Sequence, residues 1–197
     1  MLISETLTDN RILQTRKKLK MSLIQLMDYM PYTKITVNDI VKKANVNRST
    51  FYNHYKNKKD LLDDLMEDIV RELVISFKNP YLHMRTFRKS DISPQKVVLF
   101  QNVYKHKEFF EMIVKSDIFF LFQSKLIQEI KKIFLKELHV TNRKINHDIN
   151  AVFFAYAIVG MIIHWVETGF IYSPKYMAEQ LMEIINIPSD QLLIVYK

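Results

Sequence analysis

The stretch TVNDIVKKANVNRSTFYNHY, residues 36–55, carries the pattern that decides the fold. Apolar side chains recur at helical spacing in its first half and again in its second half, with room for only a tight turn between them. The predicted inner faces of the two short helices are Ile40, Val41 and Ala44, then Val46, Phe51 and Tyr55. Two amphipathic helices joined this closely predict a helix-turn-helix unit.

Polar residues mark the ends of these two helices. Thr36 is a good N-cap, and Asp39 three residues later completes a pattern like the capping box. Asn45 stands in the turn, which usually needs a left-handed backbone conformation that asparagine tolerates better than most residues. Asn47 is placed to cap the second helix.

The outer face of the second helix is polar. Once its apolar residues face inward, the residues left to face outward are Arg48, Ser49, Tyr52 and Asn53. A helix with such a surface can lie in the major groove of DNA, where the residues of its N-terminal half reach base edges. The motif therefore predicts DNA recognition by this helix.

Charge is concentrated on the same part of the chain. The net charge of +8 divides into +7 for residues 1–60 and +1 for residues 61–197. A charge excess alone more often marks a solvated surface than a binding site. On a compact helical unit with an outward polar helix, it fits contact with nucleic-acid phosphates.

Composition excludes several classes of protein. Two glycines in 197 residues are too few for a phosphate-cradling loop, and neither lies in a hairpin turn motif. With no cysteine, disulfides and thiolate-based metal or catalytic sites cannot form. We found no His-Glu-x-x-His or Gly-x-Ser-x-Gly motif, so we expect no enzyme activity, no metal and no cofactor.

Apolar spacing is helical along most of the remaining chain. Nine helices are expected, at about 10–30, 36–44, 48–55, 58–77, 94–106, 108–115, 118–138, 146–169 and 173–187. Residues 79–93 lack a periodic apolar face and read as a linker between a DNA-binding domain, 1–78, and a second domain, 94–197. Residues 192–196 are expected to dock or fray. The fold class is all-α.

The longest apolar run, residues 151–166, is shorter than the roughly 20 residues of a membrane-spanning helix. We expect it to be a buried helix, with no membrane partner. The first residues lack the pattern of a secretory signal, so we expect a cytoplasmic protein.

Residues 35–40, 44–55, Lys58, Leu61 and Leu62 closely resemble the DNA-binding domain of the TetR (tetracycline-repressor) family over residues 10–70. Residues 94–187, above all 153–165, Gly169 and Ser173-Pro174, are more distantly similar to the branch that includes dihydroxyacetone-kinase operon regulators. Asn45 and Tyr55 depart from the usual glycine and phenylalanine, and neither change removes a DNA contact. The resemblance implies a nine-helix TetR-like fold.

The resemblance also implies roles for single residues. Thr36 caps its helix and donates to a phosphate, while Arg48 is the best candidate to read a base, through guanine O6 and N7. Ser49 and Thr50 touch bases or thymine methyls, and Asn53 serves either role. The residues expected to hold phosphates are Tyr52, His54 and Lys58. On its own, a residue such as His54 is more often a surface or core histidine.

For the second domain, the resemblance implies a homodimer on an inverted-repeat operator, released by a small apolar or aromatic effector. The candidate effector-binding residues are Phe100, Tyr104, His106, Tyr156, His164 and Trp165, although core packing is the commoner role of any single aromatic. The candidate dimer residues are Ala155, Ala157, Gly160, Met161 and Ile162.

Two other functions stay open. The first is a TetR-fold regulator or architectural DNA-binding protein that a protein partner controls, with no small-molecule effector. The second is an enzyme that carries a DNA-binding domain, for which the sequence offers no convergent set of titratable groups. The sequence does not distinguish a repressor from an activator.

Overall fold

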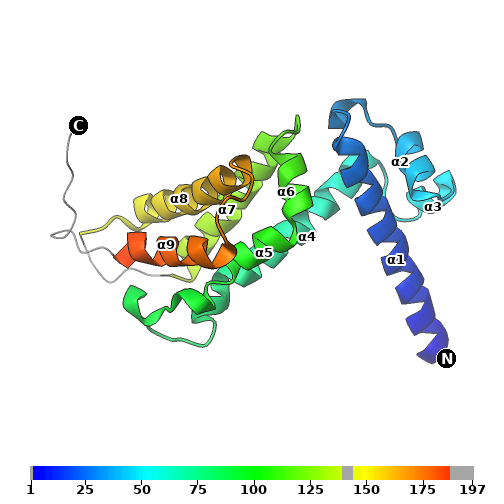
Figure 1. Cartoon of the computed structure of the whole chain (residues 1–197). Helices are drawn as coiled ribbons and strands as arrows, with labels where there is room; N and C mark the ends of the chain where they lie inside the picture. The colour runs from blue at the N-terminus through cyan, green and yellow to red at the C-terminus, as the bar shows by residue number, and fades with distance from the viewer. Residues whose placement is uncertain (1, 139–143, 187–197) are drawn as a thin grey trace. The chain divides into compact units, whose positions relative to one another are not determined.

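The computed structural model describes residues 2–138 and 144–186, with side chains from residue 10 onward except that of residue 89. These residues form nine α-helices and no strand (Figure 1). The expected all-α, nine-helix fold is confirmed for this part of the chain. The predicted docking or fraying of residues 192–196 lies outside the described residues.

The chain forms two compact units, the first of which combines Met1–Ile69 with Met112–Lys125. Its helices are α1 (Leu2–Met27), α2 (Val37–Ala44), α3 (Arg48–Tyr52) and the first part of α4 (Lys58–Lys78), with a 3₁₀ turn at Tyr32–Lys34. Figure 1 shows α2 and α3 together on one side of α1. Their apolar faces meet in a core that includes the fully buried Leu19, Leu23, Ile40, Phe51 and Leu61. Burial of each such side chain stabilises the fold by about 1.5–3 kcal/mol.

The second unit consists of Val70–Glu111 and Leu126–Lys197. It contains α5 (Leu99–Lys105), α8 (His147–Glu167), α9 (Pro174–Asn186), the first residues of α6 (Lys107–Ile113) and most of α7 (Phe119–Lys136). Among the largest buried side chains are Trp165 and Phe100, whose rings meet edge to face with centroids 5.7 Å apart. The units divide within α4, and the predicted domain limits at 78 and 94 stay a prediction.

Residues 79–96 are more ordered than the predicted linker. They contain short 3₁₀ turns at Asn79–Tyr81, Lys89–Asp91 and Pro94–Lys96, and the Tyr81 ring stacks on Phe87 with centroids 5.4 Å apart. Pro94 therefore begins a 3₁₀ turn and not the expected helix at 94. Val97, with φ −81° and ψ 79°, leaves the helical region, and α5 begins only at Leu99.

The ends of α8 follow local sequence signals. Asn146 Oδ1 accepts a hydrogen bond from the Ile149 N–H at 3.0 Å, which caps the helix. After the helix ends at Glu167, Gly169 adopts a left-handed φ of 72°, as expected for a glycine after a helix.

Helix α8 is also the one helix of the described chain that is long and apolar enough to cross a membrane, with a mean hydropathy of 1.9. Length and composition alone are weak evidence for a membrane span. One face of α8 packs into the core of the second unit, through Ala151, Ala155, Ile158, Val159, Ile162, Trp165 and Val166. Only 39% of its most apolar stretch is buried, so the helix predicted to be buried is covered along one face.

Candidate nucleic-acid interface

Helix α2 begins at a complete capping box. Thr36 Oγ1 accepts from the Asp39 N–H at 3.2 Å, and the Thr36 N–H donates to Asp39 Oδ2 at 2.9 Å. These bonds satisfy backbone groups that a helix start leaves free. Hydrogen bonds from the Thr36 hydroxyl and then from its N–H lower the pKa of Asp39. The Thr36 hydroxyl already donates to Asp39 Oδ2, with the two oxygens 2.6 Å apart. Donation to a phosphate would therefore require Thr36 to exchange this partner.

The turn between α2 and α3 has the left-handed geometry that the sequence predicts. Asn45 adopts φ 52° and ψ 52°, and its N–H donates to Lys42 O at 3.3 Å while the Val46 N–H donates to Val41 O at 3.1 Å. These two bonds close the end of α2 and turn the chain within three residues. The next helix can therefore start at Arg48.

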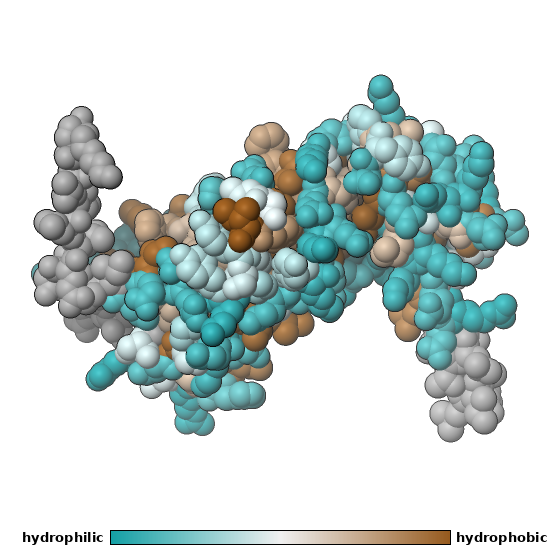
Figure 2. Space-filling view, viewed as in Figure 1, coloured by the Kyte–Doolittle hydropathy of each residue, from teal (hydrophilic) through white to brown (hydrophobic). Residues whose placement is uncertain are grey.

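Helix α3 has one buried face and one exposed polar face. Phe51 is fully buried beneath it, whereas Arg48, Ser49, Tyr52 and Asn53 are exposed. Asn47 occupies the N-cap position, but its side chain makes no capping hydrogen bond, so that part of the prediction is wrong. Figure 2 shows mostly hydrophilic surface over α2 and α3. Local periodicity thus placed the outward residues correctly.

Arg48 and Tyr52 interact on the exposed face of α3. The Arg48 guanidinium carbon lies 5.6 Å from the centroid of the Tyr52 ring, and Arg48 Nη2 donates to Tyr52 Oη at 3.3 Å. The Tyr52 ring in turn rests edge-on against Phe51, with centroids 5.5 Å apart. This arrangement holds the Arg48 guanidinium group near the surface of the helix, with its remaining N–H donors available for a ligand.

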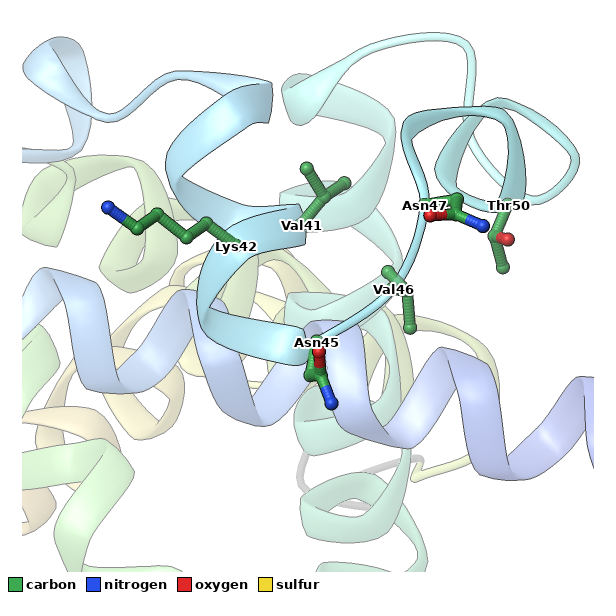
Figure 3. A pocket seen from close by; sticks show the side chains of 6 residues that line it. All are labelled: Val41, Lys42, Asn45, Val46, Asn47 and Thr50. Atoms are coloured by element: carbon green, nitrogen blue, oxygen red, sulfur yellow. The ribbon is translucent and has the colours of Figure 1, made fainter.

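A shallow open groove of about 460 Å³ lies at the helix-turn-helix (Figure 3). Its lining residues are Val41, Lys42, Asn45, Val46, Asn47 and Thr50. Figure 3 shows Asn47 and Thr50 together on the α3 side, with Lys42 pointing away from them. Thr50 is half-buried, so it borders the groove and does not project from α3.

A polar network fixes the loop after α3 to α1 and α4. Tyr55 Oη donates to Asp64 Oδ2 at 2.6 Å and accepts from Arg16 Nε at 3.3 Å. Arg16 and Lys20 both pair with Asp64 at 2.6 Å, and Lys20 also contacts Asp68. Burial opposes the charge on Asp64, but its hydrogen bonds from Arg16, Lys20 and Tyr55 hold its pKa well below the usual range. Tyr55 is buried and its pKa is raised, first by burial and then by the bond to Asp64.

The 3₁₀ turn before α2 is held by hydrogen bonds to both its carbonyl oxygens and its N–H groups. Lys58 Nζ, at the start of α4, donates to the carbonyl oxygens of Tyr32, Thr33 and Ile35 at 2.9, 3.1 and 2.7 Å. Asp117 accepts from the N–H groups of Tyr32 and Thr33 at 2.9 and 3.1 Å, and from the Thr33 hydroxyl at 2.9 Å. Burial, followed by the negative charges of Asp63 and Asp117, raises the pKa of Tyr32 to about 12.

These contacts change the interpretation of Lys58. An ammonium group has three protons, and all three are directed to backbone carbonyls of this turn. The phosphate contact implied by the resemblance would break bonds that position the start of α2. Among the other predicted phosphate ligands, Thr36 is bonded to Asp39, as described above. Tyr52 is exposed and its hydroxyl accepts from Arg48. His54 is half-buried, with its ring centroid 6.4 Å from that of Tyr55.

Three of the six predicted effector-binding residues pack against one another: Phe100, Tyr104 and Trp165. Phe100 and Trp165 are fully buried, and Trp165 Nε1 already donates to Tyr172 O at 3.0 Å. Tyr104 stacks on Trp165 with ring centroids 6.2 Å apart. Phe100 and Trp165 are thus closely packed and the indole N–H is satisfied, and their role in effector binding stays a prediction.

The remaining three candidates point elsewhere. His106 Nε2 lies 2.9 Å from Glu72 Oε2, and this carboxylate also accepts from Lys105 at 3.1 Å. The hydrogen bond from His106, opposed by burial and helped by Lys105, lowers the pKa of Glu72 to about 2. Tyr156 and His164 are exposed on α8. The described residues include no cluster of three or more side chains that would hold a metal ion.

The predicted dimer residues divide between the two faces of α8. Ala155 and Ile162 are 0% and 1% exposed, so they pack inside their own unit and neither is available to a second subunit, contrary to the prediction. Ala157 and Gly160 are exposed, and Met161 is half-buried. Among the described residues, an added Cβ at Gly160 would meet no atom within 4 Å, so no contact within that part of the chain requires this glycine.

Sequence reasoning missed functional candidates of two kinds. Two apolar side chains on α8, those of Ile149 and Phe153, are 67% and 65% exposed, and they line up with Tyr156, a residue already predicted to bind an effector, which is 60% exposed. Their four- and three-residue spacing was visible, but α8 is apolar on all sides, so its outer face could not be identified. Asp117 left no local signal, because its partners lie 84 and 85 residues away.

Comparison with known proteins assigns both parts of the chain. Residues 25–65 match the family described as bacterial regulatory proteins, tetR family, and residues 90–187 match the family described as transcriptional regulator C-terminal region. The HTH-type transcriptional regulator YxbF of Bacillus subtilis is 22% identical over 198 residues, which are 95% of this chain and 48% of YxbF. The HTH-type dhaKLM operon activator DhaS of Lactococcus lactis is 28% identical over 99 residues, 47% of this chain and 53% of DhaS. The chain thus spans about half the length of these curated relatives.

Solved structures share the fold. A TetR transcriptional regulator from Streptococcus agalactiae superposes with a TM-score of 0.61 at 23% identity, covering 92% of this chain and 98% of that one. At this identity the likeness concerns the fold alone. With family matches to both parts, a helix-turn-helix in place and the same all-helical fold, the chain belongs to the TetR family of transcriptional regulators.

Proposed function

We propose that the chain is a sequence-specific DNA-binding repressor that binds an inverted-repeat operator as a homodimer in the cytoplasm. The exposed face of α3 carries the proposal: Arg48, Ser49, Tyr52 and Asn53 project from a helix whose other side is anchored by Phe51. Arg48 reads a base in the major groove, and Ser49, Thr50 and Asn53 contact neighbouring bases or phosphates. Tyr52 and His54 hold phosphates, and Thr36 does so where it exchanges its bond with Asp39.

Replacement of Arg48 tests the assignment of base reading. A bidentate contact from arginine to guanine contributes about 1–3 kcal/mol of discrimination against the wrong base. We expect Arg48→Ala to flatten the preference at one position of each half-site, as measured by binding to a set of operator duplexes with single base-pair changes. Arg48→Lys is the matched control for charge, because it keeps the positive charge and loses the planar fork. Equal losses of affinity on operator and random DNA in both variants would contradict base reading.

The outer face of α8 supports the homodimer. Ile149, Phe153, Tyr156 and Gly160 follow one another at helical spacing and are all exposed. Hydrophobic atoms reach the surface at the start of α8 (Figure 2), and Ile184 of α9 adds a further exposed apolar side chain. Because Gly160 has no side chain, two helices can approach closely at this position. A second copy of the chain, related by a two-fold axis, buries this face and sets two α3 helices about 34 Å or more apart.

The dimer is tested by charge substitution at its centre. Phe153→Glu would place an unpaired carboxylate in an apolar interface, so we expect sedimentation of a monomer where the wild type sediments as a dimer. Glu183→Lys, at an exposed polar position of α9, is the control for a general charge effect. A wild-type monomer at micromolar concentration would refute the homodimer.

We further propose that a small apolar or aromatic effector releases the operator by binding in the second unit. Its aromatic content supports this class of ligand, although the residues first expected to bind it are mostly packed or dispersed. The test is a screen of small aromatic compounds for a rise in melting temperature, followed by operator release. If no compound in the screen binds while operator binding is normal, control by a protein partner is favoured.

An activator is the second candidate, favoured by one observation. The relative DhaS, similar over 99 residues, is itself an operon activator. A reporter fused to the selected operator distinguishes the two: deletion of the gene for this chain raises expression under a repressor and lowers it under an activator.

A further inference from the structure

The charges of α1 and α4 are separated by sign. Residues 10–27 of α1 contain five cationic side chains and no carboxylate, whereas residues 60–72 of α4 contain six carboxylates. Arg16 and Lys20 of α1 are neutralised by α4, through Asp64 and Asp68. Arg11, Lys17 and Lys18 are exposed and have no ion-pair partner among the described side chains.

The three unpaired cations lie on two sides of α1. A helix turns about 100° per residue, so Arg11 and Lys18, seven residues apart, share one edge to within about 20°. This edge lies roughly 160° round from the Arg16 and Lys20 side chains that face α4. Lys17 lies about 100° away from Lys18, toward the α4 side.

The edge of Arg11 and Lys18 borders the helix-turn-helix. Lys18 stands one turn before Ser22, which is buried at 5% exposure on the side of α1 away from α4. Helix α2 also packs against α1, and Ser22 lies about 140° round the helix from the side chains that face α4, so we assign the cover of this side to α2. Figure 1 shows α1 continuing past α2 and α3 toward its N-terminus, and residues 10–14 are exposed throughout. Two unneutralised cations therefore flank the DNA-reading helices.

From this placement we infer that Arg11 and Lys18 form a second nucleic-acid contact, which binds phosphates of duplex DNA beside the segment read by α3. The inference rests on the proposed function, because it assigns a further contact to the same DNA. A lone arginine and a lone lysine on a helix edge bind phosphates without reading sequence. The edge thus adds affinity on every sequence and lengthens the protected segment of the operator.

The salt dependence of binding measures this contact. Each phosphate contact contributes about 0.9 to the slope of log affinity against log salt. Arg11→Gln and Lys18→Gln should each lower the magnitude of the slope by about 0.9 for each DNA-binding unit (head) bound to the duplex, and the double variant should lower it by about 1.8. The affinity ratio of wild type to double variant then shrinks about 12-fold per head between 50 and 200 mM salt. The probe is a random-sequence duplex of about 40 bp, because the contact is independent of sequence.

Lys17→Gln is the matched control, since it removes the same charge from the same helix, about 100° round from Lys18. Glutamine is a good helix former, so circular dichroism should show all variants folded. An unchanged slope in the double variant, or an equal fall in Lys17→Gln, would overturn the inference while the proposed function stands. Failure of the wild type to bind any duplex would overturn the proposed function itself, and the inference with it.

Discussion

Replacement of Lys58 by methionine separates two roles for this residue. Methionine keeps a long unbranched side chain over the Tyr32 ring, which lies 4.5 Å from the Lys58 ammonium nitrogen, and removes only the charged donor. Three carbonyl oxygens of the 31–35 turn then lose their shared partner. If Lys58 holds this turn, the variant is less stable; if it holds a phosphate, the variant binds DNA with a weaker salt dependence.

The size of the effect follows from the surroundings of the three bonds. A hydrogen bond to a charged group contributes about 1.5–3 kcal/mol, but water replaces part of this where the carbonyl is accessible, as it is at Thr33. We therefore expect a loss of about 2–3 kcal/mol in the free energy of unfolding and not the sum of three full bonds. Lys59→Met is the neighbouring control: its pair with Asp63 is exposed to water, so its loss should change the free energy of unfolding far less.

Urea unfolding followed by circular dichroism gives the stability, and fluorescence anisotropy on a labelled operator at several salt concentrations gives the slope. We expect the stability of Lys58→Met to fall and the slope to stay at the wild-type value. Wild-type stability together with a slope lowered by about 0.9 per head would refute the structural role and restore the phosphate contact.

Three further predictions concern the turn, the α2 support and the pH dependence. Asn45→Ala should lower the free energy of unfolding by about 1 kcal/mol in urea denaturation, since φ at this position is 52°, while Asn45→Gly should not. Asp117→Asn should weaken operator binding in anisotropy titrations, because an amide nitrogen cannot accept the N–H groups of the 31–35 turn. Asp91→Asn, a similar change in a turn of the second unit, should leave operator affinity unchanged. The pKa of Glu72 is lowered from 4.5 to about 2, so its charge stabilises the fold above pH 4.5 and this contribution is lost as the pH falls toward 2. Glu72→Gln should flatten the stability profile over that pH range, whereas Glu111→Gln should follow the wild type.

Local patterns in the sequence were sufficient for the helix-turn-helix. The cap at Thr36, the left-handed Asn45 and the outward face of α3 each depend on residues no more than a few positions apart, and the structure shows all three. The prediction of a helix from residue 94 was wrong because it also depended on a short local signal. A serine-proline pair marks the start of a helical turn, but not whether the next residues continue it.

Contacts between distant segments could not be predicted in this way. On α8, both Ala155 and Tyr156 fit an apolar helix, and only the packing of the second unit shows that Ala155 faces inward and Tyr156 outward. Asp117 meets the turn before α2 across more than 80 residues of chain, and Lys58 does so across more than 20. When those partners are unknown, a lysine at the start of a helix indicates an anion-binding site. An aspartate in a loop then indicates only a solvated surface residue.

Selection of duplex DNA from a random library, with the wild-type protein as bait, measures whether α3 recognises a DNA sequence. We expect enrichment of an inverted repeat whose half-sites are centred about one helical turn or somewhat more apart. The same selection with Arg48→Ala should recover the repeat with one position of each half-site relaxed. Recovery of no common sequence by the wild type, or of the same sequence logo by both proteins, would contradict recognition of DNA through α3.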